Sequence, residues 1–323
     1  MTRNEAEPEQ AASRARKNGD RVHDWPLELG LEARFVEVGD GTRLRVLLGG
    51  AERGPRLIFV HGFPQNAAEW RKAAALLGER YRVVLYDLRG YGASELGRSE
   101  RYDLDTLASD LEAVIDATRS EGDPSLAPLL CAHDWGGPIA WHVVGRSPSL
   151  VRGHVSVNGP HYAAYARDLA ETSDQRARAW YTVVFQIPGV EHALSAKGAA
   201  AIAWMLRRSS PPGLFSDEDL ELYLAPMRDP ARLRAALSYY RSAARRLLTA
   251  KSGVFEAPTV TVPTIIVWGE RDAALVRTAP DTIQAHYCPT AEIRRIPASH
   301  WVPEESPEVV ASALEDLDAR TRP

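Results

Sequence analysis

The sequence predicts an α/β protein whose mostly parallel, doubly wound sheet is covered by helices on both faces. Short apolar runs alternate with helical stretches over residues 31–158, which is typical of parallel strands joined by helical crossovers. The alternation stops near Gly159, gives way to a long helical stretch, and resumes at Thr264. Hydrophobic residue types make up 45% of the 323 residues, enough for a large core and too many for a disordered chain.

Three regions follow from this pattern. The sheet domain is expected to comprise residues 26–160 and 257–323, with a helical cap (lid) domain inserted at 161–256. Residues 1–25 are polar and of mixed charge, so we expect a disordered tail there.

The first part of the sheet begins with a predicted hairpin. Ala33–Val38 and Thr42–Leu48 are extended apolar runs, and Gly39-Asp40-Gly41 between them is typical of a turn. The next predicted elements are strands at Arg56–His61 and Arg82–Tyr86 and helices at 67–78 and 103–120.

The rest of the sheet is predicted on both sides of the helical insert. The expected strands are Ala127–His133, Val151–Asn158, Thr264–Trp268 and Glu292–Ile296, and the expected helices are Gly136–Gly145, Asp281–His286 and Pro307–Leu317. Within the insert, Ser209–Gly213 predicts a loop, and Ser216-Asp-Glu-Asp219 predicts a capping box that begins the next helix.

Charge and composition exclude several classes of protein. The formal charge is 39 − 43 = −4, so the chain lacks the basic surface of a dedicated nucleic-acid binder. The first residues carry no apolar stretch of the kind a secretory signal needs, and no window of the chain is apolar enough for a membrane span, so we expect a cytoplasmic protein without a membrane partner. Two cysteines cannot form a zinc site of four Cys ligands. A homodimer is compatible with the sequence, which does not fix the oligomeric state.

Chemistry in open parallel sheets gathers at the carboxyl ends of the strands. The strand ending at His133 is followed by Asp134-Trp135-Gly136 and then a helix, which is the strand–turn–helix setting of a nucleophile elbow. The chain contains no Gly-x-Ser-x-Gly, so a serine esterase is disfavoured. Asp134 at this turn is a candidate nucleophile, with a plain helix N-cap as the alternative.

Other strand ends carry compatible groups. Asp272 and His300 each follow a predicted strand, and the order Asp134, Asp272, His300 fits a nucleophile, an acid and a base. Taken singly, Asp272 could be a turn residue and His300 a loop or core residue. The coincidence of all three at strand ends favours a catalytic triad. The N–H of Phe63, in the loop after an earlier strand, is expected to form half of an oxyanion hole.

At these residues the chain resembles an α/β-hydrolase of the epoxide hydrolase family. The resemblance covers roughly residues 30–318 and rests on three motifs: His61-Gly-Phe-Pro64, Tyr86-Asp-Leu-Arg-Gly-Tyr-Gly-Ala-Ser94 and His133-Asp-Trp-Gly-Gly137. It implies Asp134 as the nucleophile, Asp272 as the acid that orients the base, and His300 as the base. The oxyanion hole would be formed by the N–H groups of Phe63 and Trp135.

The resemblance extends to two segments of the insert. Tyr181-Thr-Val-Val-Phe-Gln-Ile-Pro-Gly189 resembles the family's first tyrosine segment, and Tyr239-Tyr240-Arg241 resembles the second. Tyr181 and Tyr240 are therefore expected to hold and protonate the epoxide oxygen. The expected pocket residues are His61, Pro64, Trp180, Phe185 and Trp301. Helix-borne arginines such as Arg241, Arg245 and Arg246 are expected on a solvated face.

The expected activity is hydrolysis of a small-molecule epoxide to a vicinal diol through an ester on Asp134, without a metal or an organic cofactor. Two alternatives remain open. A haloalkane dehalogenase would use the same triad but would need no proton donor. A catalytically reduced homologue could bind a ligand on the same scaffold.

Overall fold

The computed structural model describes residues 25–119, 127–249 and 256–322. Eight strands form one sheet in the order β1-β2-β4-β3-β5-β6-β7-β8. Their bounds are β1 Glu32–Glu37, β2 Arg43–Gly50, β3 Arg56–Val60, β4 Arg82–Tyr86, β5 Leu129–His133, β6 Gly153–Val157, β7 Thr264–Gly269 and β8 Glu292–Ile296. β1–β2 and β2–β4 pair antiparallel and the other pairs are parallel, in agreement with the predicted mostly parallel sheet.

Every predicted strand is present, with ends that differ by two residues or fewer. The helices of the sheet domain are α2 Trp25–Glu28, α3 Arg71–Leu77, α4 Leu104–Ala117, α5 Gly136–Arg146, α12 Ala279–His286, α13 Val302–Glu305 and α14 Pro307–Thr321. Two short 3-10 helices, η1 Ala67–Trp70 and η2 Pro148–Leu150, complete this part. The predicted tail at residues 1–25 lies outside the described residues except for Trp25. Trp25 is the first residue of α2. Its large apolar ring packs against the core, which a polar tail residue could not do.

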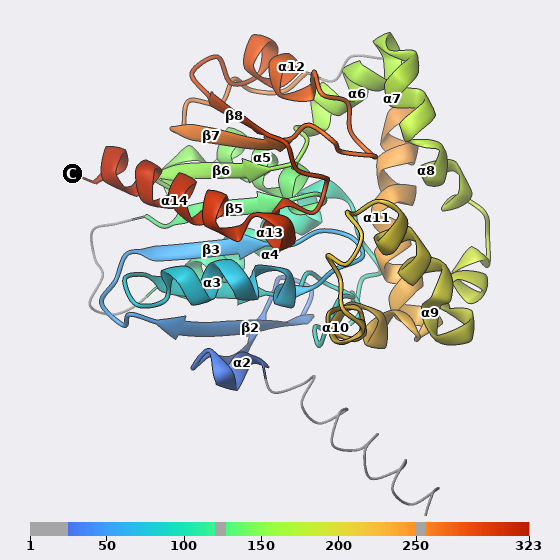
Figure 1. The fold of residues 1–323 in the computed structure, drawn as a ribbon, viewed down its shortest axis with the longest axis horizontal. Helices are drawn as coiled ribbons and strands as arrows, with labels where there is room; N and C mark the ends of the chain where they lie inside the picture. Colours follow the sequence, from blue (N-terminus) through green and yellow to red (C-terminus); the bar gives the residue numbers. More distant parts are fainter. Residues whose placement is uncertain (1–24, 120–126, 250–255, 323) are drawn as a thin grey trace, which may run out of the picture.

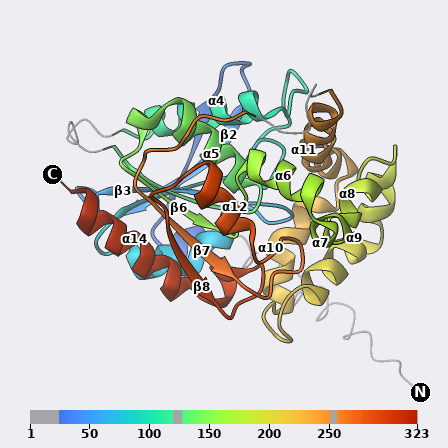
Figure 2. The same ribbon diagram turned by 90° about the horizontal axis from the view of Figure 1, so that it is seen from above.

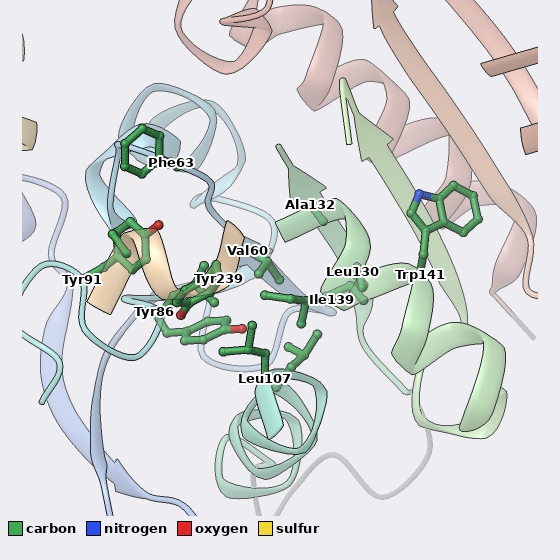
Figure 3. Close-up of a cluster of buried hydrophobic side chains, with 14 of the residues drawn as sticks. Val60, Phe63, Tyr86, Tyr91, Leu107, Leu130, Ala132, Ile139, Trp141 and Tyr239 are labelled. Carbon is green, nitrogen blue, oxygen red and sulfur yellow. The ribbon is translucent and has the colours of Figure 1, made fainter. Parts of the chain in front are cut away.

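The side chains of the strands alternate between two hydrophobic layers. Leu129 and Cys131 of β5 pack with side chains of α3 and α14, whereas Leu130 and Ala132 pack with α4 and α5. Figure 2 shows the sheet between these layers, with α4 and α5 on one side and α14 on the other. Part of the α4–α5 layer is drawn in Figure 3, where it includes Tyr239 of a later helix. Parallel strands need this cover because both of their faces are apolar.

The described residues 162–249 between β6 and β7 are mostly helical, as predicted, and residues 250–255 of the predicted helical stretch lie outside the described residues. This segment contains α6 Tyr162–Glu171, α7 Ser173–Arg178, α8 Trp180–Val184, α9 Val190–Arg208, α10 Asp217–Met227 and α11 Pro230–Thr249. Ser216 begins α10 with the predicted capping box: its hydroxyl accepts from Asp219 N–H, and its own N–H donates to Asp219 Oδ2. α9 is interrupted at residues 196–199, where the backbone leaves the helical conformation.

The helices α8 to α11 lie beyond one end of the strands (Figure 1). Hydrogen bonds attach this segment to the loops that follow β3 and β4: Asn66 Nδ2 donates to Leu222 O (2.7 Å), and Tyr239 OH donates to Arg89 O (2.9 Å). The division into a sheet domain and a cap domain at 161–256 stays a prediction. Among the described helices, none has the length and apolar character needed to cross a bilayer. The cytoplasmic location and the homodimer also stay predictions.

Candidate active site

Asp134 lies at a sharp turn between β5 and α5. Its φ is 45°, a left-handed conformation that costs a non-glycine residue about 1–3 kcal/mol. Two glycines make room for this turn. A Cβ on Gly62 would lie 2.3 Å from the Asp134 Cβ, and one on Gly136 would lie 2.2 Å from Val60 O. The Asp134 side chain remains 16% exposed, so a ligand could reach its carboxylate.

The three predicted triad residues come together at the ends of β5, β7 and β8. His300 Nδ1 lies 2.7 Å from Asp272 Oδ2, and His300 Nε2 lies 3.4 Å from Asp134 Oδ2. The imidazole therefore faces one carboxylate with each nitrogen. This is the geometry of a base that one acid orients toward a second carboxylate.

Asp272 is held by several donors in addition to His300. Its Oδ1 accepts from the N–H groups of Ala274 (2.7 Å) and Leu275 (2.9 Å), and its Oδ2 accepts from Asn158 Nδ2 (2.6 Å). Asn158 follows β6, and its Oδ1 accepts from Gly269 N–H (2.7 Å). The sequence analysis did not single out Asn158, although the rule that polar groups at strand ends carry chemistry applies to it as well.

The charges of the three groups support one another. Burial disfavours the charged form of each, but the two carboxylates raise the pKa of His300 to about 10. Burial alone would raise the pKa of Asp134 and Asp272. The hydrogen bond and positive charge of His300 outweigh this effect and hold both pKa values below their ordinary range. The two carboxylates therefore favour the imidazolium form of His300.

The loop after β3 presents one of the predicted oxyanion-hole donors. Phe63 N–H donates to Asp134 Oδ1, with 2.7 Å between N and Oδ1. His61 fixes this loop: its Nε2 accepts from Leu88 N–H (2.9 Å), so its Nδ1 bears the hydrogen and donates to Gly62 O (3.0 Å). Trp135, the second predicted donor, is the N-cap of α5 and directly follows Asp134 in the chain.

His133 and Glu69 form a second buried pair, which joins the loop that carries His300 to the loop after β3. His133 Nε2 lies 2.9 Å from His300 O, and His133 Nδ1 lies 2.8 Å from Glu69 Oε1, an electrostatic contact whose angles are poor for a hydrogen bond. The other Glu69 oxygen accepts from Gly62 N–H (3.2 Å). Glu69 was not among the predicted site residues. Its residue type favours solvent, and only the fold shows that the run Ala67–Trp70 is buried.

The two predicted tyrosines, Tyr181 and Tyr240, lie next to the loop after β3. Their ring centroids are 6.1 Å apart, and the Tyr240 ring contacts both Phe63 (5.5 Å) and Trp135 (5.0 Å) edge to face. Phe185 packs against Tyr181 and Tyr240 at 5.5 and 5.0 Å. Burial raises the pKa of both tyrosines well above the ordinary value, and the charge of Asp134 adds to this effect. Both hydroxyls therefore keep their protons at neutral pH and can donate.

The structure distinguishes among the predicted pocket residues. Phe185 contacts both tyrosines, and Pro64 is buried beside Phe63. Trp180 is 60% exposed, which does not support a place in the pocket wall. The two ring nitrogens of His61 bind backbone groups, so its polar atoms serve the loop.

Two further residues, Trp301 and Arg241, are held by contacts with the helical segment between β6 and β7. Trp301 is buried against the His300 ring (4.8 Å), and its Nε1 donates to Ser209 Oγ (3.0 Å). The expectation that Arg241 is solvated is wrong: its side chain is only 20% exposed, because it binds carbonyl groups and a carboxylate of the neighbouring helices. Among the described residues, no group of three or more His, Cys, Asp or Glu side chains could hold a metal ion.

Comparison with known proteins gives a consistent result. The alpha/beta hydrolase fold family model matches residues 55–307. The AB hydrolase superfamily protein YfhM of Bacillus subtilis (strain 168) is 30% identical over 87% of this chain and 96% of its own length. Epoxide hydrolase 3 of Mus musculus is 30% identical over 83% of this chain and 71% of its own length.

Solved structures agree with these matches. An epoxide hydrolase from Bacillus megaterium in complex with an inhibitor has a TM-score of 0.75 and 26% sequence identity, and the match covers 88% of this chain and 99% of that chain. The predicted fold class and the resemblance stated from the motifs are both confirmed. These matches imply a hydrolase that acts on a small molecule. The chain belongs to the α/β-hydrolase fold family and, within it, to the epoxide hydrolases.

Proposed function

We propose that this hydrolase opens epoxides to vicinal diols through a covalent ester on Asp134. The observation that carries the proposal is the position of two protonated tyrosines beside the aspartate, Tyr240 buried and Tyr181 partly buried. Tyr240 packs on both residues expected to provide the oxyanion-hole N–H groups, and Tyr181 lies next to it. Epoxide opening needs such donors because the ring oxygen leaves as an alkoxide.

In the first half-reaction, Asp134 Oδ2 attacks a carbon of the epoxide. Phe63 N–H already binds Oδ1, which leaves Oδ2 for attack. The carbon–oxygen bond breaks, its electron pair goes to the ring oxygen, and that oxygen takes a proton from Tyr181 or Tyr240. The product of this step is a hydroxyalkyl ester on Asp134.

Ester formation converts His300 into a base. The resting imidazolium is stabilised by Asp134, whose negative charge disappears when the ester forms, so the pKa of His300 falls. Its proton then restores the tyrosine through solvent. Neutral His300, oriented by Asp272, takes a proton from water, and the resulting hydroxide adds to Cγ of Asp134.

The second half-reaction returns the enzyme to its starting state. The N–H groups of Phe63 and Trp135 stabilise the oxyanion on Oδ1, and each such donor lowers the activation barrier by about 3 kcal/mol. The tetrahedral species then expels the diol, which takes the second proton of the water. Asp134 is left as a carboxylate and His300 as an imidazolium, so protons balance over the cycle.

Isotope transfer tests the covalent step. We expect turnover of styrene oxide in water enriched with oxygen-18 to place the label on Asp134, measured by mass spectrometry of the peptide that contains it. A second substrate is an epoxide that would open to (R)-3-[1]naphthyloxy-propane-1,2-diol, the product bound in a mutant of the Bacillus megaterium enzyme. Diol formation without label on Asp134 would contradict the ester mechanism.

The dehalogenase alternative is tested in the same assay format. The triad suits displacement at any saturated carbon, but a halide leaves without a proton. We therefore expect diol formation from epoxides and little halide release from haloalkanes. Halide release without diol formation would favour a haloalkane dehalogenase, and binding of either compound without turnover would favour a ligand-binding homologue.

A further inference from the structure

Two helices that are far apart in the sequence carry the tyrosines. Tyr181 lies on α8, a helix of five residues, and Tyr240 lies on α11, a helix of twenty residues. A five-residue helix is too short to hold its own position, because isolated helices of this length are unstable in water. The separation of the two tyrosine side chains therefore depends on the contacts that attach α8 to α11.

Arg241, the residue after Tyr240, makes this attachment. Its Nε donates to Phe185 O (2.9 Å), and its Nη2 donates to Ile187 O (3.2 Å). Phe185 is the C-cap of α8, and its N–H donates to Tyr181 O (3.0 Å). The guanidinium thus binds carbonyl oxygens at the end of the helix that carries Tyr181.

The same guanidinium binds a buried carboxylate. Arg241 Nη2 lies 2.9 Å from Oε2 of Glu191, whose side chain is only 4% exposed. Glu191 lies in the first turn of α9, directly after the segment that follows α8. Arg234 precedes Arg241 by about two turns on α11. From this more exposed position it binds the other carboxylate oxygen of Glu191 (2.9 Å). Arg241 therefore joins α8, α9 and α11.

Arginine suits this position for a physical reason. The last carbonyl groups of a helix lack partners within the helix, and the planar guanidinium offers several N–H donors in a fixed fork. A lysine ammonium on a flexible stem could not keep all three contacts in one geometry. The edge-to-face contacts among Tyr181, Phe185 and Tyr240 also favour one arrangement, but they allow a wider range of ring positions than hydrogen bonds from a guanidinium do.

We propose that Arg241 is a positioning residue that fixes Tyr181 relative to Tyr240, and so determines where the epoxide oxygen is held and which ring carbon Asp134 attacks. This inference rests on the proposed function. Arg241 has no contact with the triad residues in the described structure and acts on ring opening only through the tyrosines. Ester hydrolysis does not use the tyrosines as donors to the epoxide oxygen, so it should be much less sensitive.

The test compares Arg241→Gln and Arg241→Lys with Arg245→Gln. Arg245 is an exposed arginine one turn further along the same helix, so its loss removes an equal charge from α11. Rates of ester formation and ester hydrolysis on styrene oxide are separated by rapid-quench mass spectrometry. The carbon attacked is read from the position of oxygen-18 in the diol when the Asp134 carboxylate has been labelled beforehand.

For Arg241→Gln we expect ester formation to slow by roughly 10- to 100-fold, the size of effect that a misplacement of about 1 Å can have. Hydrolysis should change less than about twofold, and the ratio of attack at the two carbons should shift. Arg241→Lys should show a smaller loss and a partial shift, and it decides the matter if the glutamine variant does not fold. Arg245→Gln should match the parent enzyme.

Two results would overturn the inference: unchanged ester formation and regiochemistry in both Arg241 variants, or equal slowing of both half-reactions with unchanged regiochemistry. The second result would indicate a general structural role. Failure of the proposed function is distinguishable, because the parent enzyme would then form diol without carrying label on Asp134.

Discussion

The triad and the tyrosine pair are held in different ways. Asp134, Asp272 and His300 each lie just past a strand of one sheet, and hydrogen bonds from backbone N–H groups fix the two aspartates. Tyr181 and Tyr240 lie on helices outside the sheet, where aromatic contacts and Arg241 hold them. One region depends on strand ends in register and the other on packing between helices.

This difference assigns different tasks to the two regions. In the proposed mechanism, the sheet fixes the atoms that form and break covalent bonds, which must keep their geometry through both half-reactions. The helices would provide donors for one leaving oxygen in the first half-reaction. Changes in the sheet region should therefore abolish chemistry, whereas changes in the helical region should slow one step or redirect it.

The largest effect is expected from Asp134→Ala. Removal of the nucleophile should lower diol formation by about 10⁴-fold or more, because residues that act as one catalytic unit lose most of their effect together. Diol is measured by chromatography, and the circular dichroism spectrum serves as the control for folding. Substantial residual turnover would mean that another group attacks the epoxide and would end the contrast between the two regions.

His300→Gln should block the second half-reaction and spare the first. Without the base, hydrolysis should slow by about 10³- to 10⁴-fold, and the ester should accumulate on Asp134. Intact-protein mass spectrometry after addition of styrene oxide should show one added substrate mass. An unmodified protein with no turnover would indicate that His300 is needed for ester formation as well.

Tyr181→Phe and Tyr240→Phe should each slow ester formation by about 10²-fold, and the double variant should be nearly inactive. Hydrolysis of an ester already formed should be little affected, since it depends on the triad. Single-turnover kinetics separates the two rates. Equal slowing of both steps would show that the tyrosines also support the sheet region.

The pH dependence of stability should report the charges of the triad. The folded-state pKa of His300, about 10, lies above its ordinary value of 6.5, so proton binding stabilises the fold. This contribution is complete below pH 6.5 and is lost as pH rises toward 10. Urea unfolding between these limits should therefore show a steeper fall in the free energy of unfolding for the parent enzyme than for His300→Gln. Parallel curves would contradict the raised pKa.

Asn158→Ala should have the smallest effect of this series. Asp272 loses one donor but keeps the N–H groups of Ala274 and Leu275. A hydrogen bond to a charged group contributes about 1.5–3 kcal/mol, and because two donors remain we expect the lower end of this range, so hydrolysis should slow by roughly 10-fold while ester formation changes little. The two rates from single-turnover kinetics provide the check, and a slower ester-formation step alone would assign Asn158 a different role.

Sequence reasoning found the residues that local pattern determines. An apolar run that stops at a polar residue marks a strand end, which is why Asp134, Asp272 and His300 could be located before their distances were known. The structure brings all three together at one edge. Their catalytic roles, and those of the tyrosines, stay predictions.

Local sequence patterns suffice to predict the succession of strands and helices along the chain, the sharp turn at Asp134 and the polar groups at the strand ends, because each depends on neighbours along the chain. In contrast, the contact between Glu69 and His133, the exposure of Trp180 and the joining of three helices by Arg241 are visible only in the fold. Whether such a side chain is buried or solvated depends on elements distant in sequence. The residue type alone favours solvent for Glu69 and Arg241 and burial for Trp180, the reverse of what packing requires.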